Sequence, residues 1–302
     1  MVNAPDFFHP GKESPVTRYG YIGLGMMGSA MAENLIGTGA QVTVYDIDPG
    51  PVATAVDLGA VEGSSPAAVA ANSDVVSICV PAAEHITTVL EGDGGICEGA
   101  HDQLTILIHS TVHPDTIIEA RHRTDQWGVA LFDACVAGGA VQARAGMQTV
   151  LAGGLDEMDE TALGLLDIYA EKIIDAGPVG SGAALKIAVN VMTYAQFAAA
   201  TTSHDLITST GGNPQALFDA WAQMGQLGKI TEQFSAMLGI PAEHITGEFR
   251  DQMVTQVGIS QKDLTLAMDI GWPRDGMIEF VQAIHDAMPN IYNVATESGE
   301  NP

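Results

Sequence analysis

Short apolar runs alternate with amphipathic stretches through the first half of this 302-residue chain, and this alternation limits the possible folds more than any other feature. The apolar runs have the length of buried strands and lie at residues 19–22, 41–45, 75–80, 105–109 and 130–134. The stretches between them have helical periodicity and include residues 29–37, 52–58, 82–90 and 114–123. Alternating strands and helices predict a parallel sheet covered by helices on both faces, which is a doubly wound, Rossmann-like α/β fold.

The second half of the chain predicts a different architecture. Strand signals recur at residues 149–152 and 172–175 and then stop, and the pattern from Gly182 onward is helical. We therefore predict a dinucleotide-binding domain over residues 18–179. An all-helical domain for substrate binding and oligomerisation is predicted over residues 180–302.

The composition excludes several classes of partner. Acidic residues number 37 against 11 lysines and arginines, and the resulting net charge of -26 predicts repulsion of nucleic acids and anionic membranes. No window reaches the roughly 18 apolar residues of a membrane span, and residues 1–17 are expected to form a flexible extension instead of a leader or an anchor.

The cysteines Cys79, Cys97 and Cys135 are odd in number and lack CxxC spacing. This pattern argues against a disulfide framework or a metal site and favours the reducing cytoplasm.

A glycine motif directly follows the first predicted strand and opens the first helix. Its residues are Gly23, Leu24, Gly25, Met26, Met27 and Gly28, which fit the GxGxxG pattern of dinucleotide-binding folds. The first glycine permits a tight turn, the second lets the backbone approach a pyrophosphate, and the third allows the helix to pack closely on the strand. The partial positive charge of the helix N-terminus adds an attraction for phosphate. We therefore predict that these six residues bind a dinucleotide cofactor.

An acidic residue at the end of the second strand favours NAD over NADP. Asp46 lies 18 residues after Gly28, where a carboxylate can accept hydrogen bonds from the ribose hydroxyls of adenosine. A phosphate on that ribose would face Asp46 and Asp48, with no lysine or arginine in the next several residues to neutralise it.

Two later loops are expected to reach the nicotinamide half of the cofactor. Val80 and Pro81 lie at the end of the third strand given above, and Ser110 and Thr111 lie just after the fourth. We assign Ser110 to the substrate and the other three to the cofactor.

Two polar residues interrupt the apolar pattern at the start of the helical domain. Lys186 and Asn190 are four residues apart and so share one helix face, and Thr193 and Gln196 extend this stripe. Burying a lysine among apolar residues costs roughly several kcal/mol unless it is paired, although a lysine can also extend its amine to solvent from a half-exposed helix. Because ligand sites favour domain junctions, we assign the chemistry to Lys186 and Asn190.

Four ordered motifs resemble the 3-hydroxyisobutyrate dehydrogenase family, the β-hydroxyacid dehydrogenases, over nearly the whole chain after Thr17. The motifs are the glycine motif above, residues 133–139 for DAPVSGG, residues 180–190 for GxGxxxKxxxN, and residues 262–267 for KDLxLA. The resemblance implies that Lys186 is the general acid/base, that Asn190 orients the substrate, that Lys262 contacts the cofactor and that Asp263 helps to shape the substrate site. It also implies a homodimer or homotetramer built on the helical domain.

The substrate motif departs from the family pattern at two positions. The family serine that helps to bind the substrate carboxylate is Ala137 here, and the family proline two residues before it is Cys135. The backbone groups of Gly138 and Gly139 can still hold an anion, so we place Ala137, Gly138 and Gly139 in the substrate site. Cys135 is expected to be a small packing residue.

The sequence therefore predicts an NAD-dependent oxidoreductase that reversibly converts the hydroxyl of a small β-hydroxyacid, similar to 3-hydroxyisobutyrate, into a semialdehyde or keto group. An imine reductase of the same fold is one alternative, although those enzymes usually carry aspartate or tyrosine where Lys186 stands and usually prefer NADP. A non-catalytic cofactor-binding protein is a second alternative, which the loss of the serine at Ala137 leaves open.

The pH dependence of turnover tests the role of Lys186. A free lysine, with a pKa of about 10.4, is a poor base near neutrality, and the apolar helix around Lys186 is expected to lower this pKa. We expect kcat to follow an ionisation between about pH 6 and pH 9. A profile without any ionisation in that range would contradict a lysine base of lowered pKa.

Overall fold

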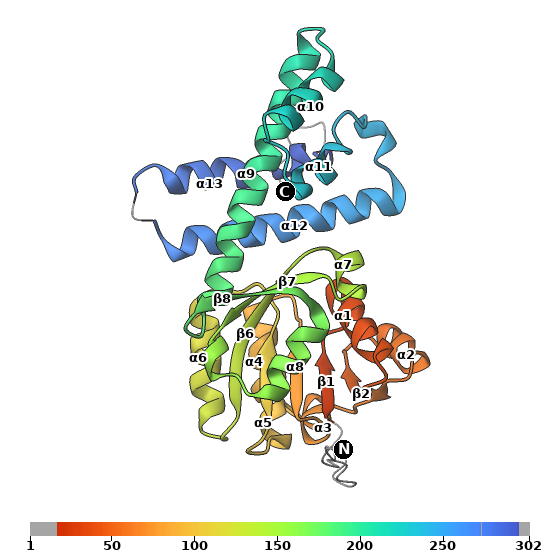
Figure 1. Cartoon of the computed structure of the whole chain (residues 1–302), viewed down its shortest axis with the longest axis vertical. Coiled ribbons are helices and arrows are strands. Elements are labelled where there is room, and N and C mark those ends of the chain that lie inside the picture. Colours follow the sequence, from red (N-terminus) through yellow and green to blue (C-terminus); the bar gives the residue numbers. More distant parts are fainter. Residues whose placement is uncertain (1–16, 273, 296–302) are drawn as a thin grey trace, which may run out of the picture. The chain divides into compact units, whose positions relative to one another are not determined.

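The computed structural model describes residues 17–272 and 274–295, which divide into two compact units (Figure 1). Described residues up to Ser110 and residues 116–180 form the first unit, and residues 111–115 join the described residues from Ser181 onward in the second. The N-terminal extension that we predicted lies outside the described residues apart from Thr17.

The first unit is built on one sheet with the strand order β3-β2-β1-β4-β5-β6-β7-β8. The strands are β1 (Arg18–Ile22), β2 (Gln41–Tyr45), β3 (Val61–Glu62), β4 (Val75–Ile78), β5 (Thr105–Ile108), β6 (Ala130–Ala137), β7 (Gln148–Gly153) and β8 (Ala170–Gly177). The first six strands are parallel and have the order 3-2-1-4-5-6 of Rossmann folds. The predicted fold class is therefore confirmed.

Strand β7 departs from the all-parallel sheet that the sequence predicted. It runs antiparallel to β6, with Ala137 opposite Thr149, and β8 then runs parallel to β7. Only residues 138–147 connect β6 to β7. A parallel return needs a crossover of roughly a dozen residues or more, so this short connection sends the chain back beside β6.

Helices cover both faces of the sheet (Figure 1). They are α1 (Met26–Gly37), α2 (Pro49–Asp57), α3 (Pro66–Ala71), α4 (Ala83–Glu91), α5 (Ile96–Gly99), α6 (Pro114–Asp125), α7 (Ala140–Arg144) and α8 (Glu160–Tyr169), with a short 3-10 turn at Leu155–Glu157. Leu35 of α1 and Leu165 of α8 belong to one buried cluster with Val75 and other alternate strand residues. On the opposite face, Val69 of α3 packs so closely on Gly20 that a Cβ there would collide with it.

Helix α3 was not predicted from the sequence, although a capping signal marks its start. The Ser65 hydroxyl accepts a hydrogen bond from the Ala68 amide at 3.1 Å, and Pro66 occupies the first helical position. A serine cap followed by proline is a strong helix-start signal, because proline lacks the amide that would otherwise need a partner. The apolar pattern is too short here to reveal the helix, so the cap was the usable signal.

The second unit is helical. Its helices are α9 (Ser181–Ser209), α10 (Pro214–Gln223), α11 (Lys229–Ser235), α12 (Gly247–Ile270) and α13 (Met277–Ile291), with a 3-10 turn at Ala242–His244. Ile187 of α9, Leu264 of α12 and Met288 of α13 belong to one buried apolar cluster. Among the described residues, no helix combines the length and the apolar character needed to cross a membrane.

A chain of buried polar groups crosses the centre of the sheet. His109, directly after β5, is 3% exposed, with Nδ1 2.7 Å from the carbonyl oxygen of Ala134 and Nε2 2.9 Å from the Ser77 hydroxyl. Because a carbonyl oxygen only accepts, Nδ1 carries the proton and Nε2 accepts from Ser77, whose oxygen lies 3.3 Å from the Tyr169 hydroxyl. Burial lowers the pKa of His109 to about 4, so the ring is neutral at pH 7.

The free energy of unfolding should consequently decrease as the pH falls below about 6.5. Between pH 6.5 and the folded-state pKa of about 4, the unfolded chain binds a proton that buried His109 does not. This difference in proton binding lowers the free energy of unfolding by roughly 3 kcal/mol between pH 6.5 and pH 4. His109→Gln should abolish this part of the pH dependence. Urea unfolding between pH 7 and pH 4 measures it, and an equal pH dependence in the two proteins would contradict a buried neutral imidazole.

Candidate cofactor-binding and catalytic sites

The three glycines of the β1–α1 turn have different surroundings. Gly23 has a φ of +93°, and a Cβ there would collide with the carbonyl oxygen of Cys79. A Cβ on Gly28 would collide with the carbonyl oxygen of Gly23, whereas a Cβ on Gly25 would meet nothing within 4 Å. The backbone is thus closed around the first and third glycines and open at the second, which suits the approach of a pyrophosphate.

The N-terminus of α1 is also suited to an anion. Its cap residue Gly25 has no side chain to satisfy the first amides, and the first turn contains no acidic residue. Met26 is 55% exposed and Met27 is partly buried, while the Leu24 side chain is buried. The positive end of the helix is therefore not compensated from within α1, and these residues fit the phosphates of a dinucleotide.

Asp46 lies directly after β2 and braces the glycine turn. One oxygen of its carboxylate accepts a hydrogen bond from the Leu24 amide at 2.5 Å, and the other accepts from the Asp48 amide at 2.8 Å. Asp46 therefore reaches the glycine turn from the neighbouring strand, which is the position that the sequence analysis inferred for a ribose acceptor.

The glycine turn and the β4 loop lie where the strand order reverses, between β1 and β4. Ligands of open α/β sheets bind at such points. Beside the glycine turn, the Val80 amide donates to the Ser110 hydroxyl at 2.9 Å, so two of the loops predicted to reach the nicotinamide half are joined. Pro81 is exposed next to Val80.

The predicted substrate loop follows β6. Ala137 is partly buried, and Gly138, with a φ of +135°, and Gly139 are exposed. The Gly139 amide donates to the Gln142 side-chain oxygen at 3.1 Å. An anion held by the Gly139 amide would replace this side-chain contact, which the sequence analysis did not anticipate.

Cys135, one strand position from the substrate loop, is fully buried. Its Sγ lies 3.5 Å from the carbonyl oxygen of Ser110, and it forms no disulfide bond. These surroundings fit the packing role that we expected.

Helix α9 carries the predicted catalytic pair. Lys186 is partly buried, and Asn190, one turn later, is 9% exposed. The Asn190 side-chain amide donates to an oxygen of Asp263 at 2.7 Å. Asp263 comes from α12 and is 2% exposed, so residues of two predicted motifs meet within the helical unit.

Lys262 lies beside the same carboxylate. Its Nζ is 3.2 Å from Oδ1 of Asp263, close enough for an ion pair but without hydrogen-bond alignment. Nζ also donates to the carbonyl oxygen of Thr111 at 2.7 Å. Because residues 111–115 belong to the helical unit, the structure brings together two residues predicted to contact the cofactor.

Tyr194 is a member of this cluster that the sequence analysis missed. Its hydroxyl donates to the same Asp263 oxygen as Asn190, at 3.2 Å. The predicted continuations of the stripe behave differently, since Thr193 bonds to its own helix at Val189 and Gln196 accepts from Thr231. The spacing of four from Asn190 was the usable signal, but an aromatic residue on an apolar helix usually only packs.

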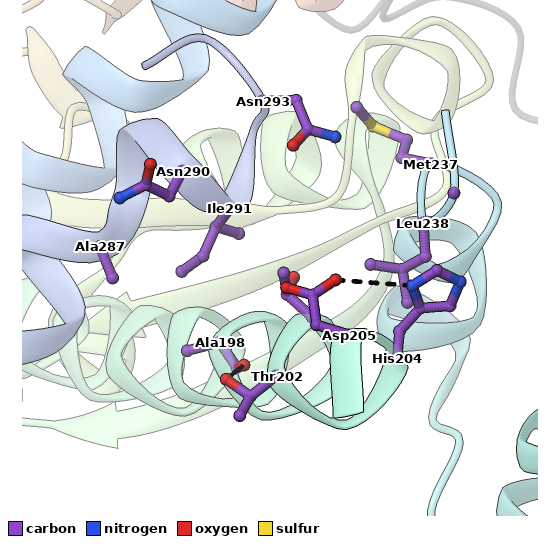
Figure 2. A pocket seen from close by; sticks show the side chains of 12 residues that line it. Ala198, Thr202, His204, Asp205, Met237, Leu238, Ala287, Asn290, Ile291 and Asn293 are labelled. Atoms are coloured by element: carbon purple, nitrogen blue, oxygen red, sulfur yellow. Dashed lines mark hydrogen bonds and ion pairs between the residues drawn. The ribbon is translucent and has the colours of Figure 1, made fainter. Parts of the chain in front are cut away.

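The helical unit also contains a cavity of about 210 Å³ (Figure 2). It lies between the second half of α9, the turn after α11 and the end of α13, and none of the predicted site residues lines it. Figure 2 shows Asp205 beside His204, with 3.7 Å between Oδ1 of Asp205 and Nδ1 of His204.

Within residues 17–272 and 274–295, no group of three or more His, Cys, Asp or Glu side chains could hold a metal ion.

Comparison with known proteins decides the family. Residues 18–177 match the family model described as the NAD binding domain of 6-phosphogluconate dehydrogenase. An uncharacterised oxidoreductase of Mycobacterium tuberculosis is 30% identical over 87% of this chain and 88% of its own length. A probable mitochondrial 3-hydroxyisobutyrate dehydrogenase of Dictyostelium discoideum is 29% identical over 83% of this chain and 78% of its own length. The chain belongs to the 3-hydroxyisobutyrate dehydrogenase family.

Membership of the 3-hydroxyisobutyrate dehydrogenase family makes the protein an oxidoreductase with a nicotinamide-dinucleotide-binding domain. The structure of 3-hydroxyisobutyrate dehydrogenase from Mycobacterium tuberculosis with L-serine has the same fold, with a TM-score of 0.75. The two chains are 24% identical, and the match covers 91% of this chain and 93% of the other. The family and the cofactor class that the motifs predicted are thus confirmed.

Two glycine substitutions should separate cofactor binding from folding. Gly25→Ala adds a Cβ in open space, so the free energy of unfolding should change by less than about 0.5 kcal/mol while NADH binding weakens at least about ten-fold. Gly28→Ala sets a Cβ against backbone and should cost about 1–3 kcal/mol of stability as well. Thermal unfolding and NADH titration by fluorescence measure both effects. Wild-type NADH affinity in folded Gly25→Ala would show that no pyrophosphate approaches this residue.

Proposed function

We propose that the protein transfers a hydride between NAD and the hydroxyl or carbonyl group of a small β-hydroxyacid similar to 3-hydroxyisobutyrate. The observation that carries the proposal is the arrangement on α9, where Lys186 lies one turn before an Asn190 that buried Asp263 holds in place. The family of the chain and the name of its Dictyostelium relative support the substrate class.

In this proposal Lys186 moves the proton of the reaction. During oxidation, the hydroxyl proton of the substrate passes to the uncharged amine of Lys186 as the hydride leaves the carbinol carbon, and a carbonyl forms. During reduction, the ammonium returns this proton to the developing alkoxide. The nicotinamide ring, when bound, takes up or supplies the hydride. Asn190 orients the reacting oxygen.

The cofactor role belongs to the glycine turn and its neighbours. Gly23–Gly28 would receive the pyrophosphate, and Asp46 would accept from the adenosine ribose. We propose NAD as the preferred cofactor because a ribose phosphate would meet the carboxylates of Asp46 and Asp48. Val80, Pro81, Thr111 and Lys262 are proposed to contact the nicotinamide half.

The substrate acid group is assigned to backbone donors. Ala137 offers no hydroxyl, so the amides of Gly138 and Gly139 would bind the carboxylate, with Ser110 and Asp263 completing the site. This arrangement tolerates a different acid group more readily than a serine contact would, because fewer directional bonds define it.

Lys186 also separates this proposal from its rivals. An imine reductase of this fold usually carries aspartate or tyrosine at that position, and a protein that only binds cofactor has no need for the hydrogen-bonded Asn190 and Asp263. We therefore rank the dehydrogenase above both alternatives.

We also propose an assembly and a cellular location for the protein. Several large apolar side chains of the helical unit are exposed, among them Met192, Leu206 and Met224, which supports a homodimer or homotetramer built on this unit. The described cysteines form no disulfide, which agrees with a cytoplasmic enzyme.

The decisive assay is NADH formation with a panel of 3-hydroxyacids, 4-hydroxybutyrate, serine and simple alcohols, repeated with NADP. We expect turnover of a 3-hydroxyacid with NAD, and a loss of about 10²- to 10⁴-fold in kcat for Lys186→Ala, because a general acid/base contributes that much. NADH binding should persist in this variant.

Lys229→Ala is the matched control, since Lys229 is an exposed lysine of the same unit at the start of α11. It should retain wild-type turnover. Full activity of Lys186→Ala would contradict the assigned base, and silence of the wild-type protein across the panel with intact NADH binding would contradict the substrate class.

A further inference from the structure

We propose that Tyr194 is a positioning residue that acts through Asp263 to hold the side-chain amide of Asn190 in the orientation in which its nitrogen donates both to Asp263 and to the reacting oxygen of the substrate. The role in catalysis rests on the function proposed above, whereas the positioning itself is a property of the helical unit alone. Lys186, Asn190 and Tyr194 follow one another at intervals of four on α9 and so share a face, and Asp263 approaches that face from α12.

The Asp263 carboxylate needs several donors because it is 2% exposed. A buried carboxylate that has lost its water is costly unless protein donors replace it. Two donors converge on the same oxygen, the Asn190 amide at 2.7 Å and the Tyr194 hydroxyl at 3.2 Å. The Lys262 ammonium lies 3.2 Å from the other oxygen.

The carboxylate determines which end of the Asn190 amide faces it. An ionised carboxylate only accepts hydrogen bonds, so the nitrogen of the amide must point at Asp263. The second hydrogen on that nitrogen then has a fixed direction, in which it can donate to the reacting oxygen of the substrate while the hydroxyl proton passes to Lys186. If the carboxylate shifted, the amide could rotate and turn its oxygen toward the reacting oxygen, where it would compete with Lys186 for the single hydroxyl proton and repel the developing alkoxide.

Tyr194 is well placed to prevent that shift. Its ring is buried and lies edge-on to Phe197, with 6.3 Å between the ring centres, so the hydroxyl has a fixed direction. Burial and the nearby charge of Asp263 hold the pKa of Tyr194 far above its ordinary value. The hydroxyl therefore remains a donor at every pH at which the protein is assayed. Tyr292, whose charge also raises this pKa, and Lys262, which lies beside Asp263, are titratable groups near this pair.

The test is Tyr194→Phe, which removes one oxygen and keeps the packed ring. We expect kcat for the best substrate of the panel to fall about ten-fold, with KM and the NADH dissociation constant within about two-fold of wild type, because the interaction matters most when the hydroxyl reacts. A lowered Tm with unchanged kcat would indicate a purely structural tyrosine and overturn the proposal.

A second readout does not depend on turnover. The side-chain amide protons of Asn190, assigned in ¹⁵N spectra by comparison with Asn190→Asp, should exchange with water several-fold faster in Tyr194→Phe than in wild type. Unchanged exchange would overturn the positioning role. If the wild-type protein oxidises no member of the panel but the exchange rate rises, the proposed function fails and the positioning stands.

Tyr292→Phe is the matched control. Tyr292 is a buried tyrosine of the same apolar cluster, and its hydroxyl makes no hydrogen bond to Asp263. It should leave kcat and Asn190 exchange unchanged. In an Asp263→Asn background, Tyr194→Phe should add less than about two-fold to the loss in kcat, because the two residues act as one unit. Full additivity would show that Tyr194 acts elsewhere.

Discussion

The first unit depends on the close packing of main-chain atoms against one another at the β1–α1 turn. A side chain at Gly23 or Gly28 would occupy the space of a carbonyl oxygen, so the turn exists only because those positions have no Cβ. That closeness places the N-terminus of α1 directly above the end of β1, beside the Asp46 carboxylate from β2. The proposed cofactor site is therefore defined by main-chain geometry, and one side chain, that of Asp46, supports it.

In the helical unit, hydrogen bonds between side chains hold the proposed site in place. Its important polar groups are side chains that meet across α9 and α12, and each is buried enough that an unpartnered donor or acceptor would be costly. Such a cluster has a single arrangement only when all its hydrogen bonds are formed, because the loss of one bond leaves buried polar groups without a partner. Asp263 is the shared acceptor, and so the arrangement of Asn190 depends on the other groups that hold this carboxylate, Tyr194 and Lys262.

The structural elements that could be predicted from the sequence are those that short local sequence patterns determine. The glycine motif, the strands around it and the helix that carries Lys186 follow from patterns a few residues long, and the family resemblance extends them. Strand β7 could not be predicted to run antiparallel from its own residues, because its direction depends on the length of the connection after β6. Tyr194 and the Gln142 contact to Gly139 were missed because each depends on a partner or a rotamer that the motif does not encode.

The Asp46 side chain has two roles, one structural and one proposed for cofactor selection. Its carboxylate supports the glycine turn through the Leu24 amide, and by our proposal the same group selects against a phosphorylated ribose. Redesign of this chain for NADP therefore cannot proceed by charge alone. A replacement that merely removes the carboxylate would also remove the support of the turn. A successful redesign would have to supply a neutral acceptor of similar reach, such as asparagine or serine, together with a cation elsewhere in the β2–α2 loop.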